Sequence, residues 1–185
     1  MEQFSHLATR IFKEAIAVYE REGSIDSSPI NPYQLHTIEH DLFRKNWIDN
    51  AQWCLEDIIR DPEIDPVQAL IIKRRIDKSN QERTDLVELI DSFFLQQYAS
   101  VQPQSDAKIN TESPAWAIDR LSILELKIYN MNKALQGAGS DEDSGCEKRI
   151  GNRETEVQSD EKLTVSLLLF MACQTVDAVH HMGFL

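Results

Sequence analysis

The segment R-R-I-D-K-S-N-Q-E-R-T-D-L-V-E-L-I-D (residues 74–91) has the periodicity of a helix but an unusually polar middle. At helical spacing, one face carries polar side chains and another carries apolar ones. We expect the apolar face to pack on the rest of the protein, and the polar face either to meet water or to form a polar cluster inside a bundle. The polar positions are Asp77, Gln81, Thr84, Glu88 and Asp91, and the apolar positions are Ile72, Ile76, Val87, Ile90 and Phe94.

The composition is typical of one globular domain, because 185 residues with 42% hydrophobic and 27% charged side chains suffice for a single core. The net charge of −12 argues against nucleic acid and anionic membrane surfaces as partners, since both attract basic surfaces. The longest apolar run, residues 167–173, is too short to cross a bilayer. We therefore expect no membrane insertion. The start M-E-Q-F-S-H lacks the pattern of a signal peptide, which predicts a cytoplasmic location.

Apolar stripes and proline-containing caps predict the secondary structure. A first helix ends at Gly23, and a third ends near Tyr98. A polar residue followed by proline is typical of a helix start, and three of these pairs precede a helical stripe. No useful β alternation is present. We therefore expect an all-α fold, an antiparallel bundle of four to five helices. The three pairs are Asn31-Pro32, Asp65-Pro66 and Ser113-Pro114.

The chain divides into three predicted regions. Residues 1–137 form the helical bundle. Residues 138–160 are rich in Gly, Ser, Asp and Glu and poor in apolar groups, which is typical of an acidic flexible linker. Residues 161–185 regain apolar positions and predict a C-terminal helix.

The pattern H-T-I-E-H (residues 36–40) matches H-x-x-E-H, which on a helix places two imidazoles one turn apart and suits zinc. We favour the simpler interpretation of two ordinary histidines near a helix start, because no third ligand is evident. No metal ligand is assigned on this basis.

A carboxylate-rich constellation spans the second and third helices. Glu56 and Asp57 would face Glu88 and Asp91 if the short connection makes these helices antiparallel neighbours. Two carboxylates three residues apart share a helix face, as magnesium sites on helices require. The arrangement is similar to the helical nucleotide pyrophosphohydrolases, although their upstream pair is E-x-x-E and this one is adjacent. We favour a solvated acidic surface, which is the usual role of such helix faces, and a magnesium site is the alternative.

A mixed-charge cluster is predicted between the second, third and fourth helices. Buried groups of this kind must form a connected hydrogen-bond network. Such a network either fixes helix register or lines a ligand pocket. Trp47, Trp53 and Trp116 would be stacking walls of that pocket, or they are ordinary core residues. The candidate ligand-binding residues are Asn46, Trp53, Glu56, Asp57, Asp77, Asn80, Gln81, Arg83, Asp85, Glu88, Asp119, Arg120 and Lys127.

Three runs resemble an uncharacterised family of bacterial helical proteins, best known from Bacteroidetes, that carries a domain-of-unknown-function label. They lie at residues 46–62, 74–91 and 111–129 and contain the motifs W-x-x-E-D, N-Q-x-R-x-D-x-x-E-x-I-D and D-R-L-S-I-L-x-L-K. The resemblance covers residue 1 to about 135. Family members carry histidine where this chain has Cys54, which weakens a metal role there. Beyond residue 138 the match is poor, so the last helix is divergent or truncated.

The resemblance implies a cytoplasmic bacterial protein and brings no established reaction. The resemblance also implies a gene context, because members of that family lie near genes for sugar transfer in cell-envelope glycan assembly. Two hypotheses follow from the sequence. The first is a small-molecule or nucleotide-binding bundle, with a magnesium-dependent hydrolase as its catalytic form. The alternative is a non-catalytic interaction or accessory protein linked to envelope glycan assembly, because no nucleophile-and-base pair is evident.

Overall fold

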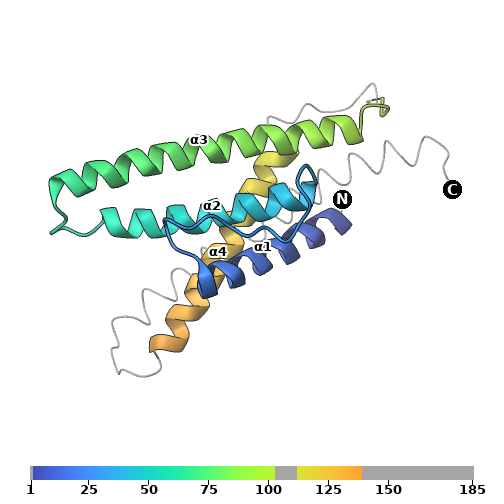
Figure 1. Ribbon diagram of the computed structural model, residues 1–185. Coiled ribbons are helices and arrows are strands. Elements are labelled where there is room, and N and C mark those ends of the chain that lie inside the picture. The colour runs from blue at the N-terminus through green and yellow to red at the C-terminus, as the bar shows by residue number, and fades with distance from the viewer. Residues whose placement is uncertain (1, 103–111, 139–185) are drawn as a thin grey trace.

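The computed structural model describes residues 2–102 and 112–138 and folds them into helices joined by loops (Figure 1). Within these ranges no strand is present, and the predicted all-α bundle is confirmed. The expected C-terminal helix and nearly all of the expected linker lie outside the described residues. The helices are α1 (Glu2–Glu22), α2 (Ile38–Ile59), α3 (Pro66–Gln97) and α4 (Pro114–Ala138).

The start of α3 is where the sequence predicts it. Asp65 is the N-cap, and its carboxylate accepts the backbone N–H groups of Val67 and Gln68, each at 3.0 Å. Pro66 occupies the first helical position, where its missing N–H costs nothing. The cap fixes where the chain turns back after α2.

The start of α4 also agrees with the prediction, but α3 supplies its cap. The Asp91 carboxylate accepts the backbone N–H of Ala115 at 3.1 Å. The hydroxyl of Ser113 donates to the other Asp91 oxygen at 2.6 Å. An acidic side chain near a helix N-terminus also interacts favourably with the helix dipole. Asp91 therefore anchors α4 on the end of α3.

The predicted start of α2 at Pro32 is wrong, because the helix begins only after Thr37. The Thr37 hydroxyl accepts the backbone N–H of His40 at 3.2 Å and acts as the N-cap. Asn31 instead accepts the N–H of Tyr33 at 3.0 Å and donates to the carbonyl of His40 at 2.9 Å. Its side chain therefore closes a turn ahead of the helix.

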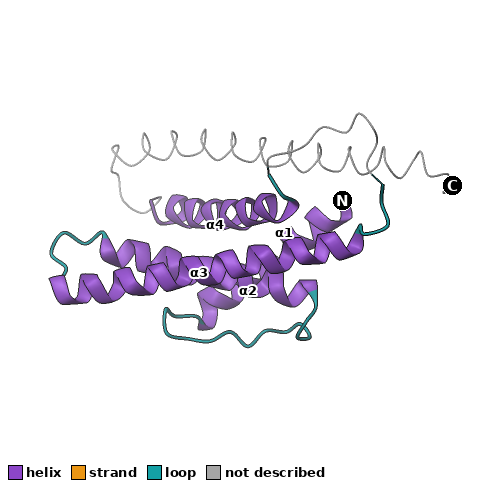
Figure 2. Cartoon of the chain, turned by 90° about the horizontal axis from the view of Figure 1, so that it is seen from above, coloured by secondary structure: helices purple, strands orange, loops and turns teal. Residues whose placement is uncertain are grey.

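α2 is the central helix of the described bundle. It packs along α1, α3 and α4, whereas α1 meets α3 near the end of α3, where the Phe4 ring packs on Phe93 and Phe94. Figure 1 shows α2 and α3 running antiparallel, with α4 crossing them obliquely, and Figure 2 shows that α4 lies in a separate layer beside the α2–α3 pair. All six positions from Lys45 to Asn50 are buried, so neighbouring residues cover most of this stretch of α2 on every side.

The apolar core lies mainly between α1, α2 and the second half of α3. Phe12 of α1 and Phe43 of α2 are fully buried at its centre. The rings of Tyr19 and Trp47 meet edge to face at 4.9 Å between centroids. Burial of side chains this large is the main favourable contribution to folding.

Candidate functional site

Four charged side chains meet where α2, α3 and α4 come together, and we call them the charged quartet: Lys45, Asp49, Arg83 and Asp119. Lys45 Nζ lies 2.5 Å from Asp49 Oδ2 and 2.9 Å from Asp119 Oδ1. Arg83 Nη2 lies 3.1 Å from Asp119 Oδ1, and Arg83 Nε lies 2.9 Å from Asp49 Oδ1. The quartet carries two positive and two negative charges, so its net charge is zero.

Helix geometry explains how the quartet assembles. Lys45 and Asp49 are four residues apart on α2 and therefore share one face. Arg83 reaches this face from the middle of α3, and Asp119 from the second turn of α4. The Lys45 side chain is fully buried. An ammonium without water is tolerated only when charged partners surround it, and here two aspartates do.

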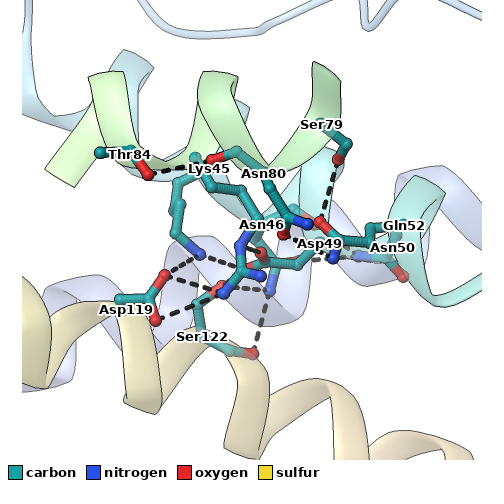
Figure 3. Close-up of polar contacts among 11 residues, drawn as sticks. Lys45, Asn46, Asp49, Asn50, Gln52, Ser79, Asn80, Thr84, Asp119 and Ser122 are labelled. Atoms are coloured by element: carbon teal, nitrogen blue, oxygen red, sulfur yellow. Dashed lines mark hydrogen bonds and ion pairs between the residues drawn. The ribbon is translucent and has the colours of Figure 1, made fainter. Parts of the chain in front are cut away.

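Neutral side chains extend the quartet into a hydrogen-bond chain that joins α2 to α4 (Figure 3). The Ser122 hydroxyl donates to Asp49 Oδ2 at 2.6 Å, and it accepts from Asn46 Nδ2 at 2.9 Å. Asn50 Nδ2 in turn donates to Asn46 Oδ1 at 2.9 Å. Asn46 and Ser122 are fully buried, so these bonds replace the hydrogen bonds that water would supply.

A second bridge joins α2 to α3 beside the quartet. Gln52 Nε2 donates to Asn80 Oδ1 at 2.9 Å, and the Ser79 hydroxyl donates to Gln52 Oε1 at 3.1 Å (Figure 3). One amide thus uses both its donor and its acceptor across the helix pair.

Electrostatic balance decides the ionisation of Asp119. Burial alone would raise the pKa of this carboxyl, but the nearby Lys45 and Arg83 outweigh burial and hold the pKa below its ordinary value of 3.8. Asp119 therefore remains a carboxylate at neutral pH and keeps both cations paired.

Two buried atoms of the quartet lack a hydrogen-bond partner in the described part of the chain: Asp49 Oδ1 and Arg83 Nε. They attract each other by charge at 2.9 Å, but the N–H is not directed at the oxygen. Both residues line a cleft of about 160 Å³ between α2, α3 and α4, which we call the polar cleft after its charged residues, although most of its exposed surface is apolar. The other lining residues are Gln52, Trp53, Glu56, Arg60, Ile123 and Leu126.

The structure brings some of the candidate residues together. Asn46, Arg83 and Asp119 belong to the network, and Trp53 and Glu56 line the polar cleft. Sequence reasoning missed four members of the network. The usable signal for two of them was the K-x-x-x-D spacing in α2, which is typical of an intrahelical ion pair. The missed residues are Lys45, Asp49, Asn50 and Ser122.

The remaining candidates lie elsewhere and mostly pair with neighbours at the surface. Asn80 is exposed but reaches Gln52 across the helix pair. Glu88 is exposed, and Lys127 lies half-buried on α4. The surface pairs are Asp57 with Arg60, Asp77 with Lys73, Gln81 with Asp85, and the half-buried Arg120 with Glu112.

The expected magnesium arrangement of Glu56, Asp57, Glu88 and Asp91 does not form. Asp57 and Glu88 are exposed, and Asp91 is occupied at the start of α4. Across residues 2–102 and 112–138, no group of three His, Cys, Asp or Glu side chains is placed to hold a metal ion. Asp91 does not join a metal site because its carboxylate caps the start of α4, where a negative charge interacts favourably with the helix dipole.

The H-x-x-E-H match also lacks its required context. His36 precedes α2 and has a φ of 66°, so only His40 of the pair is helical. The three tryptophans separate as well. Trp47 is core, Trp116 is 46% exposed, and Trp53 alone lines the polar cleft. A stacking wall is therefore supported for Trp53 only.

Comparison with known proteins matches residues 39–167 to a family described as "Protein of unknown function (DUF4254)". The match spans well over half of the chain. The chain belongs to DUF4254. The residues matched to DUF4254 include the quartet and the polar cleft but not α1. The match also extends beyond residue 135, the end of the resemblance described from the sequence motifs. No curated protein and no solved structure gave a significant match. None of the described helices is long and apolar enough to cross a membrane.

Proposed function

We propose that this protein binds a small polar molecule, of which nucleotides are the first class to test, in the polar cleft between α2, α3 and α4. The observation that carries the proposal is a pair of buried atoms in residues that line this cleft, Asp49 Oδ1 and Arg83 Nε, which lie 2.9 Å apart as an ion pair but make no directed hydrogen bond. A buried polar atom without a partner costs about 1–3 kcal/mol, and a ligand that supplies the partner recovers that cost.

The energetics of the quartet support a role beyond stability. Replacing a buried ion-pair group by apolar residues of similar volume is often neutral or stabilising. A chain selected for stability alone has little reason to bury Lys45 completely. Binding does give a reason, because charges that are already paired and fixed need no reorganisation when a ligand arrives.

The lining residues suggest how such a ligand would be held. Trp53 offers a ring face for stacking, and Arg60 offers a guanidinium at the cleft's outer side, where it now pairs with the exposed Asp57. Within the described residues, Glu56 makes no hydrogen bond or ion pair, so its carboxylate is available to accept from a ligand amino or hydroxyl group.

The size of the cleft limits what enters it. At about 160 Å³ it is smaller than the ~300–1,000 Å³ of sites that enclose a drug-sized ligand. The polar cleft would therefore take one end of a molecule, such as a base or a sugar, while the rest extends over Arg60.

Calorimetry of the full chain with a panel of nucleotides, with and without Mg²⁺, tests the proposal. We expect saturable heat for at least one compound. Trp53→Ala should raise its Kd about tenfold, because a lost stacking contact is worth about 1–3 kcal/mol. Trp116→Ala is the matched control, since Trp116 is exposed on α4 outside the cleft and should leave Kd unchanged.

A second variant separates binding from stability. Replacing the quartet together (Lys45→Met, Asp49→Leu, Arg83→Met and Asp119→Leu) should keep the melting temperature close to that of the wild type but abolish the heat of binding. No saturable heat with any compound, or equal losses in Trp53→Ala and Trp116→Ala, would overturn the proposal.

The alternative function is a non-catalytic interaction or accessory role, in keeping with the gene context that the sequence resemblance implies. An exposed apolar stripe at the start of α3 favours it. Val67, Leu70 and Ile71 are 65%, 51% and 44% exposed and lie at spacings that share one helix face. The same proposal includes a bacterial origin and a cytoplasmic location, which are supported by the sequence resemblance.

Co-purification with an envelope glycosyltransferase tests this alternative. Ile71→Glu should abolish the co-purification, whereas Leu95→Glu, an exposed position near the other end of α3, should not. Retention of the partner by Ile71→Glu would remove the stripe as the contact surface.

A further inference from the structure

A second and larger hollow lies on a different face of α2, and we call it the α2–α3 groove. It holds about 460 Å³, within the size range of small-molecule sites. The loop that follows α1 closes one side of it, with Ile25 to Pro29 contributing to the wall. It shares no lining residue with the polar cleft.

The groove is locally basic in a chain whose net charge is −12. Its cations are Arg44, Arg75 and Lys78, and its acids are Asp26 and Glu82. Arg75 Nη2 lies 2.9 Å from Asp26, and Lys78 Nζ lies 3.5 Å from Glu82. Arg44 is exposed and has no hydrogen bond or ion pair within residues 2–102 and 112–138. The groove therefore has one positive charge in excess, on Arg44.

The loop wall is held in place by α3. The Arg75 guanidinium donates to the carbonyl of Ile25 as well as pairing with Asp26. The Ser27 hydroxyl is occupied within the loop, where it donates to the Ser24 carbonyl at 2.9 Å. The Ser28 hydroxyl makes no hydrogen bond to any described residue, so it remains available to a ligand.

The floor of the groove is apolar. Trp47, Ile48 and Leu55 line it and are buried against the rest of the bundle, with 3–8% of each residue exposed. A ligand in this groove would therefore meet an apolar surface below and a cationic rim above. This combination suits a molecule with an apolar body and one anionic group.

We propose that the α2–α3 groove binds a small molecule that carries a phosphate or carboxylate group on an apolar body. Arg44 makes the main contact, because a guanidinium fork matches both oxyanions with two parallel hydrogen bonds. The Ser28 hydroxyl donates a further bond. Lys78 adds charge, since its 3.5 Å pairing with Glu82 is long enough to be exchanged for a ligand oxygen.

Titration of the ¹⁵N-labelled full chain with phenyl phosphate, benzoate and inorganic phosphate tests this proposal. We expect saturable shifts of the Trp47 indole and the Ser28 amide with phenyl phosphate or benzoate, and weaker binding of inorganic phosphate, which lacks the apolar body. The indole of Trp116, which does not line the groove, is the internal reference and should not move.

Two charge variants locate the site. Arg44→Gln should raise the Kd of the tighter probe about tenfold, as loss of a charge-assisted hydrogen bond does. Arg74→Gln removes the same charge from an exposed position on α3 outside the groove and should change Kd less than about twofold. Absence of saturable shifts with both organic probes, or equal losses in the two variants, would overturn the proposal. Retained amide spectra of both variants would show that they still fold.

Discussion

The two buried faces of α2 achieve burial by opposite means. Towards α1, Phe43 and Trp47 pack into an apolar core in which almost any well-shaped neighbour is favourable. Towards α3 and α4, Lys45 and Asp49 are buried among charges and amides that accept few arrangements. The apolar face therefore supplies most of the stability, and the polar face contributes little net free energy as long as its charges remain paired.

The largest expected effect comes from the apolar face. Phe43→Ala removes a fully buried ring and leaves a cavity, so we expect a loss of about 4 kcal/mol in the free energy of unfolding. Urea denaturation followed by tryptophan fluorescence measures it. A loss below about 1 kcal/mol would mean that this face is loosely packed, and the comparison would fail.

The polar face is tested by removing a cation that pairs with its two aspartates. Lys45→Met keeps the volume but leaves Asp49 and Asp119 with one cation instead of two, which should cost about 3 kcal/mol or more. Lys133→Ala is the control, since Lys133 pairs with Glu20 at the surface and its removal should cost no more than about 0.5 kcal/mol. Equal losses in the two variants would show that burial of the lysine makes no difference.

Acid should weaken the polar face selectively. Because the folded-state pKa of Asp119 lies below its ordinary 3.8, its contribution to stability is fully present above that value and disappears as pH falls through the folded-state pKa. Denaturant titrations of the wild type and Asp119→Asn at several pH values measure this. The difference between their free energies of unfolding should shrink as pH drops below 3.8, and a difference independent of pH would contradict the assignment.

The smallest effect concerns the junction of α3 and α4, where a carboxylate caps a helix instead of joining the network. Asp91→Ala should cost about 1 kcal/mol, the usual value for a lost N-cap. Thermal denaturation followed by circular dichroism measures it, with Asp91→Asn as a variant that keeps the acceptor. A cost above about 3 kcal/mol would place Asp91 with the buried charges.

Local signals predicted the helix boundaries well, because a cap depends on a few adjacent residues. Asp65 and Ser113-Pro114 mark the true starts of α3 and α4. Asn31-Pro32 carries the same signal and failed, because Thr37 offers a competing cap six residues later. Sequence pattern alone does not rank two caps of similar strength.

The candidate site was harder to predict because it depends on what surrounds α2. Arg83 stood out in the polar middle of α3, and Asp119 stood out with Arg120 as a charged pair in an otherwise apolar stretch of α4. Lys45 and Asp49 lie among core residues of α2, and their spacing alone is equally typical of a surface ion pair. Whether such a pair meets water or protein is decided by the neighbours of the helix, which the spacing of its own residues does not reveal.

The burial of all six residues from Lys45 to Asn50 has a dynamic consequence. Backbone amides in this stretch are hydrogen-bonded within α2 and covered by buried side chains while α1, α3 and α4 remain docked around them. Their hydrogens should exchange with deuterium only when the whole assembly opens, later than those at the exposed start of α3. The slowest-exchanging amides would thus belong to the helix that carries both the aromatic core and the buried charges.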